Sequence, residues 1–443
     1  MLKVGWSLSE EPCAAVVSTS LLSRVCSYCF RRSEKLRRCS ACRIAYFCDA
    51  GCQRAGWPGH REECRGLVAC RPRMPPDTAR LLARLIFYQP PEQPLPDWPL
   101  SRSLDSLMDH AGEMESDETR LEHLTSLAHV LAQYVGPERM PTMSRLRSLF
   151  GKIVVNCFSI LDEDLNTVGT GLFLGLSAFD HSCRPNAVIV FNGERASVKL
   201  IEAVSSVKEI RICYCDPLLE RSERRRQLAS QFYFHCSCPA CLDTETDAAK
   251  TAFACPLCRG RLAEDGKCEK CGRQCSDEEK EEAMLAAAGL RWELERLETR
   301  IKSDLPDLTA CFEQAKKLLS SAEKHLHALN VSRARCLQQC MDLAIELECF
   351  QEASDYAKLL LPIYERFLAP CWPTLLLHRA KLGKLLLYLE QLPEAAVQLR
   401  KAMVDSDKVL EAGHPLRDSI QSLTAQLAES QCIVSERMSL DQM

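Results

Sequence analysis

The feature that most constrains this chain is the close spacing of potential metal ligands between residues 26 and 64. Eight of them occur there as four pairs, in the order Cys26 and Cys29, Cys39 and Cys42, Cys48 and Cys52, His60 and Cys64. Two or three residues between the members of a pair allow one turn or one helix start to present both to the same ion, and zinc takes four such ligands in a tetrahedron. Eight ligands therefore predict two zinc sites, in a segment too short to fold without them.

Two further cysteine clusters lie later in the chain. They are Cys236, Cys238 and Cys241, and then Cys255, Cys258, Cys268 and Cys271. The second has two closely spaced pairs around a Gly-containing stretch, which predicts a zinc ribbon with a structural ion of its own. The first supplies only three ligands. Because three thiolates without a neighbouring acid–base pair suit a closed structural site better than a catalytic one, we expect a distant residue to complete it.

The composition is typical of a soluble intracellular protein. Its 443 residues predict roughly two to four hydrophobic cores, and its formal net charge of -4 gives no overall attraction to nucleic acid or to an anionic membrane. No run of about 18 apolar residues occurs, and glutamates stand where a signal peptide would have its apolar core. We therefore expect a cytoplasmic and nuclear protein without membrane contact. In such reducing surroundings the 27 cysteines are metal ligands or buried side chains rather than disulfides.

The segment from 26 to 64 resembles a MYND zinc finger, because Gln53 and the run Trp57-Pro58-x-His60 accompany its eight ligands. If the pairs alternate, the first and third pairs hold one ion and the second and fourth hold the other. The resemblance implies that Gln53 and Trp57 belong to a surface that docks short proline-containing peptides. Basic residues also outnumber acidic ones over residues 24 to 49. That patch is either a solvated basic face or a contact for DNA phosphates, and we keep DNA as an alternative partner.

Three later motifs resemble the SET domain of the SMYD family of protein-lysine methyltransferases, and they occur in the family's order. They are VGTGLFLGLSAFDHSCRPNAVIVFNG at 168–193, ICYCD at 212–216 and ERRRQLASQFYFHCSCPAC at 223–241. In that family the cysteine of the His-Ser-Cys motif joins the three post-SET cysteines on one zinc. The resemblance therefore implies that Cys183 is the fourth ligand of the Cys236 cluster.

The same resemblance implies an S-adenosylmethionine-dependent protein-lysine N-methyltransferase that acts on histone or other protein lysines in chromatin regulation. Methyl transfer from a sulfonium to an amine is an in-line displacement, which needs a neutral lysine, alignment and polarised oxygens. The resemblance implies three catalytic positions. Tyr214 would polarise the groups around the transferred methyl, and Phe158 and Phe232 would line the lysine channel. It also implies six cofactor-contacting positions, which are Asn156, Ser177, Asp180, His181, Tyr214 and Phe234. Phe234 would stack on the adenine.

The implied fold class is α+β, with a β-rich SET domain split by the finger and a helical insertion and followed by an all-α TPR-like domain. The expected boundaries are 1–25 for an N-terminal SET segment, 26–64 for the finger, 65–150 for the helical insertion, 151–216 for the SET core, 217–242 for the post-SET zinc cluster, 250–275 for the zinc ribbon and 277–443 for the helical domain. LECFQEAS at 347–354 recurs as LEQLPEAA at 389–396, 42 residues later, which indicates irregular TPR-like helix pairs. Such pairs form either a concave binding wall or plain helical packing.

The chain departs from the family pattern at three places. The 25 residues before the finger lack the Gly-x-Gly loop with which the family cradles its cofactor, and the Gly-x-Gly of this chain is Gly169-Thr170-Gly171. Asp180 stands where the family has asparagine, and Phe232 stands where it has a second active-site tyrosine. These departures leave an alternative function open, a catalytically weak or inactive adaptor that docks proline-containing partners in transcriptional regulation. In either case we expect a monomer.

Overall fold

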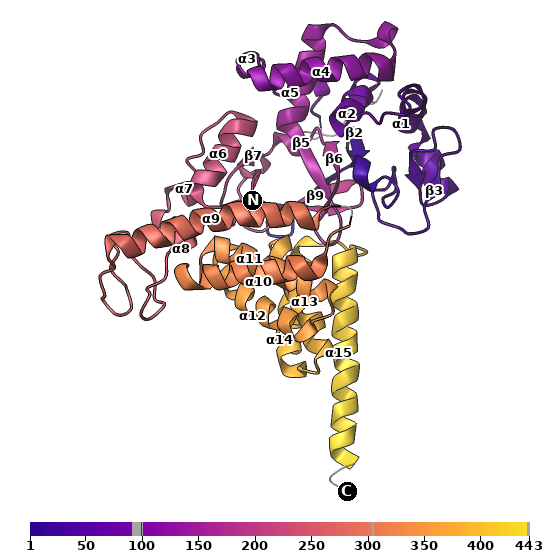
Figure 1. The fold of residues 1–443 in the computed structure, drawn as a ribbon. Helices are drawn as coiled ribbons and strands as arrows, with labels where there is room; N and C mark the ends of the chain where they lie inside the picture. Colours follow the sequence, from indigo (N-terminus) through magenta and orange to yellow (C-terminus); the bar gives the residue numbers. More distant parts are fainter. Residues whose placement is uncertain (91–98, 100, 304, 441–443) are drawn as a thin grey trace. The chain divides into compact units, whose positions relative to one another are not determined.

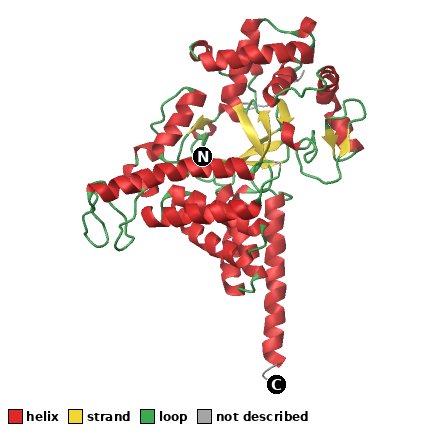
Figure 2. Ribbon diagram, viewed as in Figure 1, coloured by secondary structure: helices red, strands yellow, loops and turns green. Residues whose placement is uncertain are grey.

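The computed structural model describes residues 1–90, 99, 101–303 and 305–440, and the chain divides into two compact units (Figure 1). The first unit comprises residues 1–181, 185–212 and 227–235, and the second comprises 182–184, 213–226 and 236–443. Within the described part of the chain every named strand lies in the first unit, whereas the second is built of helices and their connecting loops (Figure 2). This confirms the predicted succession of a mixed first part and a helical last part.

The first unit is organised around two three-stranded antiparallel sheets, in the orders β1-β9-β8 and β2-β6-β5. Its strands are β1 (Ser7–Glu10), β2 (Ala14–Val17), β3 (Arg37–Arg38), β4 (Tyr46–Phe47), β5 (Cys157–Leu161), β6 (Thr167–Leu172), β7 (Asp180–His181), β8 (Ala187–Asn192), β9 (Arg195–Leu200) and β10 (Arg211–Ile212). Its helices are α1 (Ala50–Ala69), α2 (Asp77–Ile86), α3 (Ala111–Glu115), α4 (Glu118–Val135) and α5 (Met143–Asn156). The N-terminal segment thus supplies one edge strand to each sheet.

The zinc-finger segment lies against the turn between β8 and β9. Gly193 in that turn has a φ of +64°, and a Cβ atom at this position would lie 2.4 Å from the carbonyl oxygen of Cys29. Only glycine therefore fits there without displacing the finger. The Nη2 of Arg31 also donates to the side chain of Asn192 at 3.3 Å.

The Gly-x-Gly at residues 169–171 lies inside β6 and forms no loop. A Cβ atom on Gly169 would lie 2.4 Å from the carbonyl oxygen of Val16 and 2.6 Å from the ring of Phe30. The absence of a side chain at Gly169 therefore allows β2 and the finger to approach this strand closely.

A hydrophobic core forms between the finger, the helices of the first unit and the sheet β2-β6-β5. Its buried members include Leu67 on α1, Leu82 on α2, Leu131 on α4 and Phe150 on α5. The four helices each turn one apolar face inward, as the three-and-four spacing of their apolar residues dictates. Leu172 joins the same core from β6.

The second unit has two short helices, α7 and α8, and a run of longer helices that begins at Asp277. Its helices are α7 (Pro239–Leu242), α8 (Thr244–Thr251), α9 (Asp277–Ile301), α10 (Leu308–His325), α11 (Val331–Glu346), α12 (Phe350–Phe367), α13 (Pro373–Tyr388), α14 (Leu392–Val409) and α15 (Pro415–Leu440). Helix α6 (Arg221–Phe232) contains the division between the units.

The repeated sequence falls on two equivalent turns, between α11 and α12 and between α13 and α14. Glu348 and Glu390 occupy the same place in these turns, and both have a left-handed φ, +59° and +58°. The next residue closes each turn, since Cys349 N donates to Ala344 O and Gln391 N donates to Leu386 O, both at 2.8 Å. The 42-residue echo is therefore a repeated helix pair in the structure.

Mild acid is expected to destabilise the second unit through His378. This residue of α13 is 3% exposed and donates from Nε2 to Ala357 O at 3.0 Å. Burial lowers the pKa of His378 to about 4, whereas an unfolded chain protonates it near pH 6.5. The stability that the neutral imidazole provides above pH 6.5 is therefore lost as the pH falls toward 4, by about 2 kcal/mol between pH 7 and pH 5.

Denaturant unfolding followed by helical circular dichroism at pH 7 and pH 5 measures this loss, with His378→Gln as the comparison. The difference between the two pH values should be smaller in the variant. An equally steep pH dependence in both proteins would contradict the role of His378.

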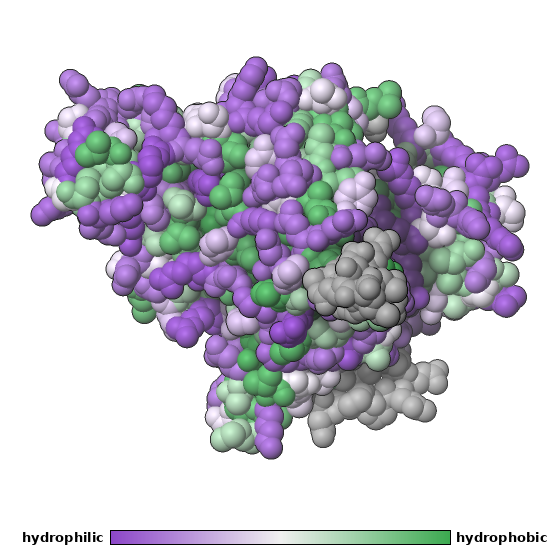
Figure 3. All heavy atoms as spheres, turned by 90° about the horizontal axis from the view of Figure 1, so that it is seen from below, coloured by the Kyte–Doolittle hydropathy of each residue, from purple (hydrophilic) through white to green (hydrophobic). Residues whose placement is uncertain are grey.

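No helix among the described residues combines the length and the apolar character that crossing a bilayer requires. On the face drawn in Figure 3, hydrophilic residues predominate and hydrophobic ones form small separate groups among them.

Candidate metal centres and cofactor site

The structure brings the eight ligands of the finger into two groups of four, and within each group all ligand atoms lie within 4.8 Å of one another. The groups are Cys26, Cys29, Cys48 and Cys52, and then Cys39, Cys42, His60 and Cys64. Helix α1 supplies ligands to both groups, and Asp49 fixes its first turn by accepting from Cys52 N at 2.9 Å. The chain thus adopts the alternating pairing.

The ligand-atom distances in the finger suit zinc. A tetrahedral zinc with bonds of about 2.3 Å holds its sulfur ligands roughly 3.8 Å apart. The sulfurs of Cys29 and Cys48 are 3.7 Å apart, and those of Cys39 and Cys64 are 3.9 Å apart. The Nε2 of His60 faces the second group. Spacing and donor set therefore fit zinc at both sites.

Cys183 lies with the three later cysteines in the second unit. Its sulfur is 4.0 Å from that of Cys236 and 3.6 Å from that of Cys241, and its N–H donates to the sulfur of Cys238 at 3.3 Å. Burial raises the pKa of the Cys238 thiol, but the N–H groups of Cys183 and Cys241 and the neighbouring thiols outweigh this effect and lower the pKa. The cluster therefore has the spacing that zinc requires, and N–H donors stabilise the thiolate of Cys238.

The ribbon forms a fourth group, whose ligand atoms are those of Cys255, Cys258, Cys268 and Cys271. The sulfurs of its first and last residues are 3.8 Å apart, and those of its middle two are 3.5 Å apart. The N–H groups of Cys271 and Lys270 lower the pKa of Cys268. Ala254 N donates to His325 O at 2.9 Å, which fastens the ribbon to the end of α10. This group also fits a tetrahedral zinc.

Two of the predicted cofactor positions, His181 and Phe234, lie side by side in the first unit. Their ring centroids are 5.8 Å apart and their planes are inclined by 53°. Both side chains are half-buried. Each therefore keeps part of its surface accessible to solvent.

Asn156 is the last residue of α5 and is 8% exposed. Its Nδ2 donates to Lys152 O at 2.9 Å and to Met108 O at 2.8 Å. Both amide hydrogens are therefore used within the protein, so a cofactor could bond to this side chain only through Oδ1. The side chain also ties the end of α5 to the segment before α3.

Ser177 and Phe158 each have a fixed neighbour in the first unit. Ser177 lies in the turn before β7 and donates to Leu174 O at 2.8 Å. Phe158 in β5 packs edge to face against the buried Phe173, with centroids 5.9 Å apart. The rotamers of both side chains are thereby constrained.

Asp180 is a solvated surface residue whose side chain is 78% exposed, with Arg211 Nη2 at 3.8 Å. An exposed pair at this distance contributes little to stability. Asn186, which sequence reasoning missed, is better connected. Its Oδ1 accepts from Arg211 N at 2.7 Å and its Nδ2 donates to Glu209 O at 2.9 Å, which holds the start of the strand that leads to Tyr214.

Tyr214 lies two residues beyond β10, and Phe232 is the last residue of α6. Both side chains are half-buried, and they belong to the second and the first unit respectively. The catalytic roles of Tyr214, Phe232 and Phe158 stay predictions.

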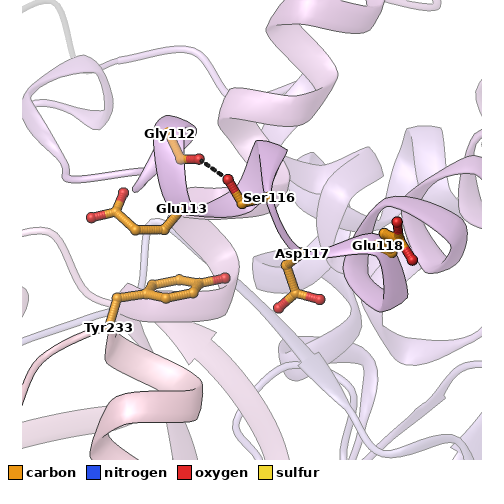
Figure 4. Close-up of a pocket in the computed structure, with 6 residues that line it drawn as sticks. All are labelled: Gly112, Glu113, Ser116, Asp117, Glu118 and Tyr233. Carbon is orange, nitrogen blue, oxygen red and sulfur yellow. Dashed lines mark hydrogen bonds between the residues drawn. The ribbon is translucent and has the colours of Figure 1, made fainter.

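Tyr233, also missed from the sequence, lines an open hollow in the first unit with Gly112, Glu113, Ser116, Asp117 and Glu118 (Figure 4). Its backbone is left-handed, with a φ of +58°, and Arg120 stacks on its ring at 4.9 Å. Two of the three carboxylates of the hollow have a basic neighbour, since Glu113 lies 3.4 Å from His110 and Asp117 lies 3.2 Å from Arg120. These contacts connect α3 and α4 to Tyr233.

Known proteins resemble this chain over nearly its whole length. Residues 26–64 match the family model of the MYND finger. The histone-lysine N-methyltransferase SMYD3 of Mus musculus is 31% identical over 399 residues, which cover 89% of this chain and 85% of the mouse protein. The histone-lysine N-methyltransferase ASHR1 of Arabidopsis thaliana is 27% identical, covering 97% of this chain and 91% of its own. The human N-lysine methyltransferase SMYD2 is 26% identical, covering 92% and 90%.

Proposed function

Since this chain belongs to the SMYD family, we propose that it is an S-adenosylmethionine-dependent protein-lysine N-methyltransferase acting on histone or other protein lysines. The observation that carries the proposal is the similarity to mouse SMYD3, a histone-lysine N-methyltransferase, over 89% of the chain. Zinc is structural at all four clusters, because each cluster has four protein ligands and so leaves no open position for a substrate.

In this proposal the residues of the first unit hold the cofactor. Phe234 stacks on the adenine beside His181, Asn156 accepts a hydrogen bond through Oδ1, and Ser177 and Asp180 border the site. S-adenosylmethionine supplies an electrophilic methyl group on a sulfonium. Asp180 carries a negative charge where the family has a neutral amide, and that charge favours a cationic ligand nearby.

The remaining residues act on the lysine. Phe158 and Phe232 exclude water from its amine, which favours the neutral, nucleophilic form because burial disfavours the charged one. The hydroxyl of Tyr214 orients and polarises the groups around the transferred methyl. No covalent enzyme intermediate is needed, so positioning and electrostatics supply the rate enhancement.

Titration calorimetry of S-adenosylmethionine into the zinc-loaded chain tests the proposal. We expect micromolar binding, weakened about tenfold to hundredfold by Phe234→Ala, because stacking of a base on an aromatic ring is worth about 1–3 kcal/mol. Phe350→Ala is the matched control, since Phe350 is also half-buried and pairs with another aromatic ring, at 4.5 Å from Tyr388.

Absence of binding by the folded, zinc-loaded chain would overturn the enzyme proposal and leave the adaptor. One observation favours the adaptor as a second candidate: Trp57 on α1 is 41% exposed and packs against the zinc ligand His60, with centroids 5.9 Å apart. An exposed tryptophan on a metal-fixed surface suits the docking of proline-containing segments. We further propose a monomer of the cytoplasm and nucleus, with DNA as an alternative partner of the finger.

A further inference from the structure

Glu63 is the centre of a buried charged cluster in the first unit. It lies on α1 between the zinc ligands His60 and Cys64, and its side chain is 3% exposed. Its Oε1 accepts from Nε of Arg80 at 3.0 Å and lies 2.9 Å from Nη2 of the same guanidinium, and its Oε2 accepts from Nη2 of Arg84 at 2.6 Å. We call Glu63, Arg80 and Arg84 the Glu63 cluster.

The Glu63 cluster faces a zinc ligand. The Nε2 of His60 points to Cys42 Sγ at 3.6 Å, and its Nδ1 points the other way, with Oε2 of Glu63 at 3.5 Å. That Nδ1 is buried and has no hydrogen-bond partner as it stands. A histidine that binds zinc through Nε2 carries its proton on Nδ1, and a carboxylate behind it fixes the tautomer and strengthens the ligand. Glu63 is placed to be that carboxylate.

The charges of this region balance when zinc is present. Three thiolates and one Zn²⁺ leave a charge of about -1 at the site of Cys39, Cys42, His60 and Cys64, and Glu63 adds another negative charge. Arg80 and Arg84 supply two positive charges, so the sum is about zero. Asp77, 3.5 Å from Arg80, is 38% exposed and is screened by water.

Arg80 connects the Glu63 cluster to the sheet β2-β6-β5. Its side chain is 2% exposed, and its Nη1 donates to the carbonyl oxygen of Val17 at 2.9 Å. Val17 ends β2, which pairs with β6, and α1 and β2 both lie beside α2 (Figure 1). Arg80 of α2 therefore joins these three elements. The second metal site of the finger and the strand β2 are thereby connected through Glu63 and Arg80.

We propose that Glu63 is a positioning residue for the second zinc site of the finger, and that Arg80 couples this site to β2. Glu63 holds His60 by accepting from Nδ1–H, and the arginines hold Glu63. The other finger site, of Cys26, Cys29, Cys48 and Cys52, has four sulfur ligands and needs no such support.

The test is Glu63→Gln in the full zinc-loaded chain, exposed to increasing EDTA and then to a thiol-alkylating reagent read residue by residue by mass spectrometry. Removal of a carboxylate that hydrogen-bonds to a metal-binding histidine typically weakens metal binding about 10–100-fold. We therefore expect Cys39, Cys42 and Cys64 to become alkylated at about 10–100-fold lower EDTA, while the four cysteines of the other finger site stay protected as in the parent.

Glu62→Gln is the matched control, because Glu62 is the neighbouring glutamate and bonds to arginines, including Arg139 at 2.8 Å, without contacting a ligand. It should leave both sites unchanged. Should Glu63→Gln fail to fold, Glu63→Gln/Arg84→Gln restores the charge balance and is measured in the same way. Selective exposure of the three thiols in the folded variant supports the proposal. Protection equal to the parent, or equal loss at both finger sites, overturns it.

Discussion

A Cys183→Ala variant is expected to lose the zinc of its cluster while keeping the others. Structural zinc contributes about 10–16 kcal/mol of binding free energy, and removal of one of four thiolates forfeits about 4 kcal/mol, or about a thousandfold in affinity. Helix α7 has only four residues, and hydrogen bonds from α6, such as that from Arg225 Nε to Cys236 O at 3.0 Å, are the other contacts that hold this segment. The segment from 236 to 242 should therefore loosen locally while α6 stays folded.

Metal content by mass spectrometry and alkylation of the three remaining thiols measure this loss. The control is Cys340→Ala, since Cys340 is a fully buried cysteine of α11 that belongs to no cluster found among the described residues. It should keep the parent's zinc content. A Cys183→Ala protein with undiminished zinc would show that Cys183 is not a ligand.

A Tyr214→Phe variant is expected to lose most of the proposed methyl transfer, by about 10²–10³-fold in kcat. Removal of a single preorganised donor from a transition state costs about 2.7–4 kcal/mol. Affinity for S-adenosylmethionine should change much less, because phenylalanine keeps the aromatic ring of Tyr214 and the other proposed cofactor contacts remain. The loss would therefore appear in kcat rather than in cofactor binding.

Single-turnover methylation of a lysine peptide, with calorimetry of the cofactor in parallel, separates these two quantities. Tyr388→Phe is the matched control, since Tyr388 is 68% exposed in α13 and should leave the rate unchanged. If Tyr214→Phe transfers methyl groups as fast as the parent, Tyr214 is not the polarising residue.

The metal sites were the most predictable part of this molecule, because most of their ligands are two to four positions apart in the sequence and one turn brings them together. Cys183 is different, since it lies 53 residues before Cys236 and spacing alone predicts only an incomplete site. The resemblance to the SMYD family supplied that ligand.

The contacts that support the second zinc site of the finger and the strand before Tyr214 were not predictable from sequence patterns. Glu63 and Arg80 are charged residues on two amphipathic helices, and charged residues in such helices usually face the solvent. Their burial depends on the angle at which α1, α2 and β2 meet. Asn186 was missed for a similar reason, because its partners lie more than 20 residues away and no local spacing marks them.

The order of the strands along the chain has a consequence for synthesis on the ribosome. Ser7 of β1 pairs with Lys199 of β9, so the first strand must wait for about 190 residues before its neighbour exists. At about 5–20 residues per second that interval is roughly 10–40 s. The finger can close around its metals during this time. The apolar strand Ala14–Val17 has no partner until β6 is made, about 155 residues later, and is until then a natural target for chaperones.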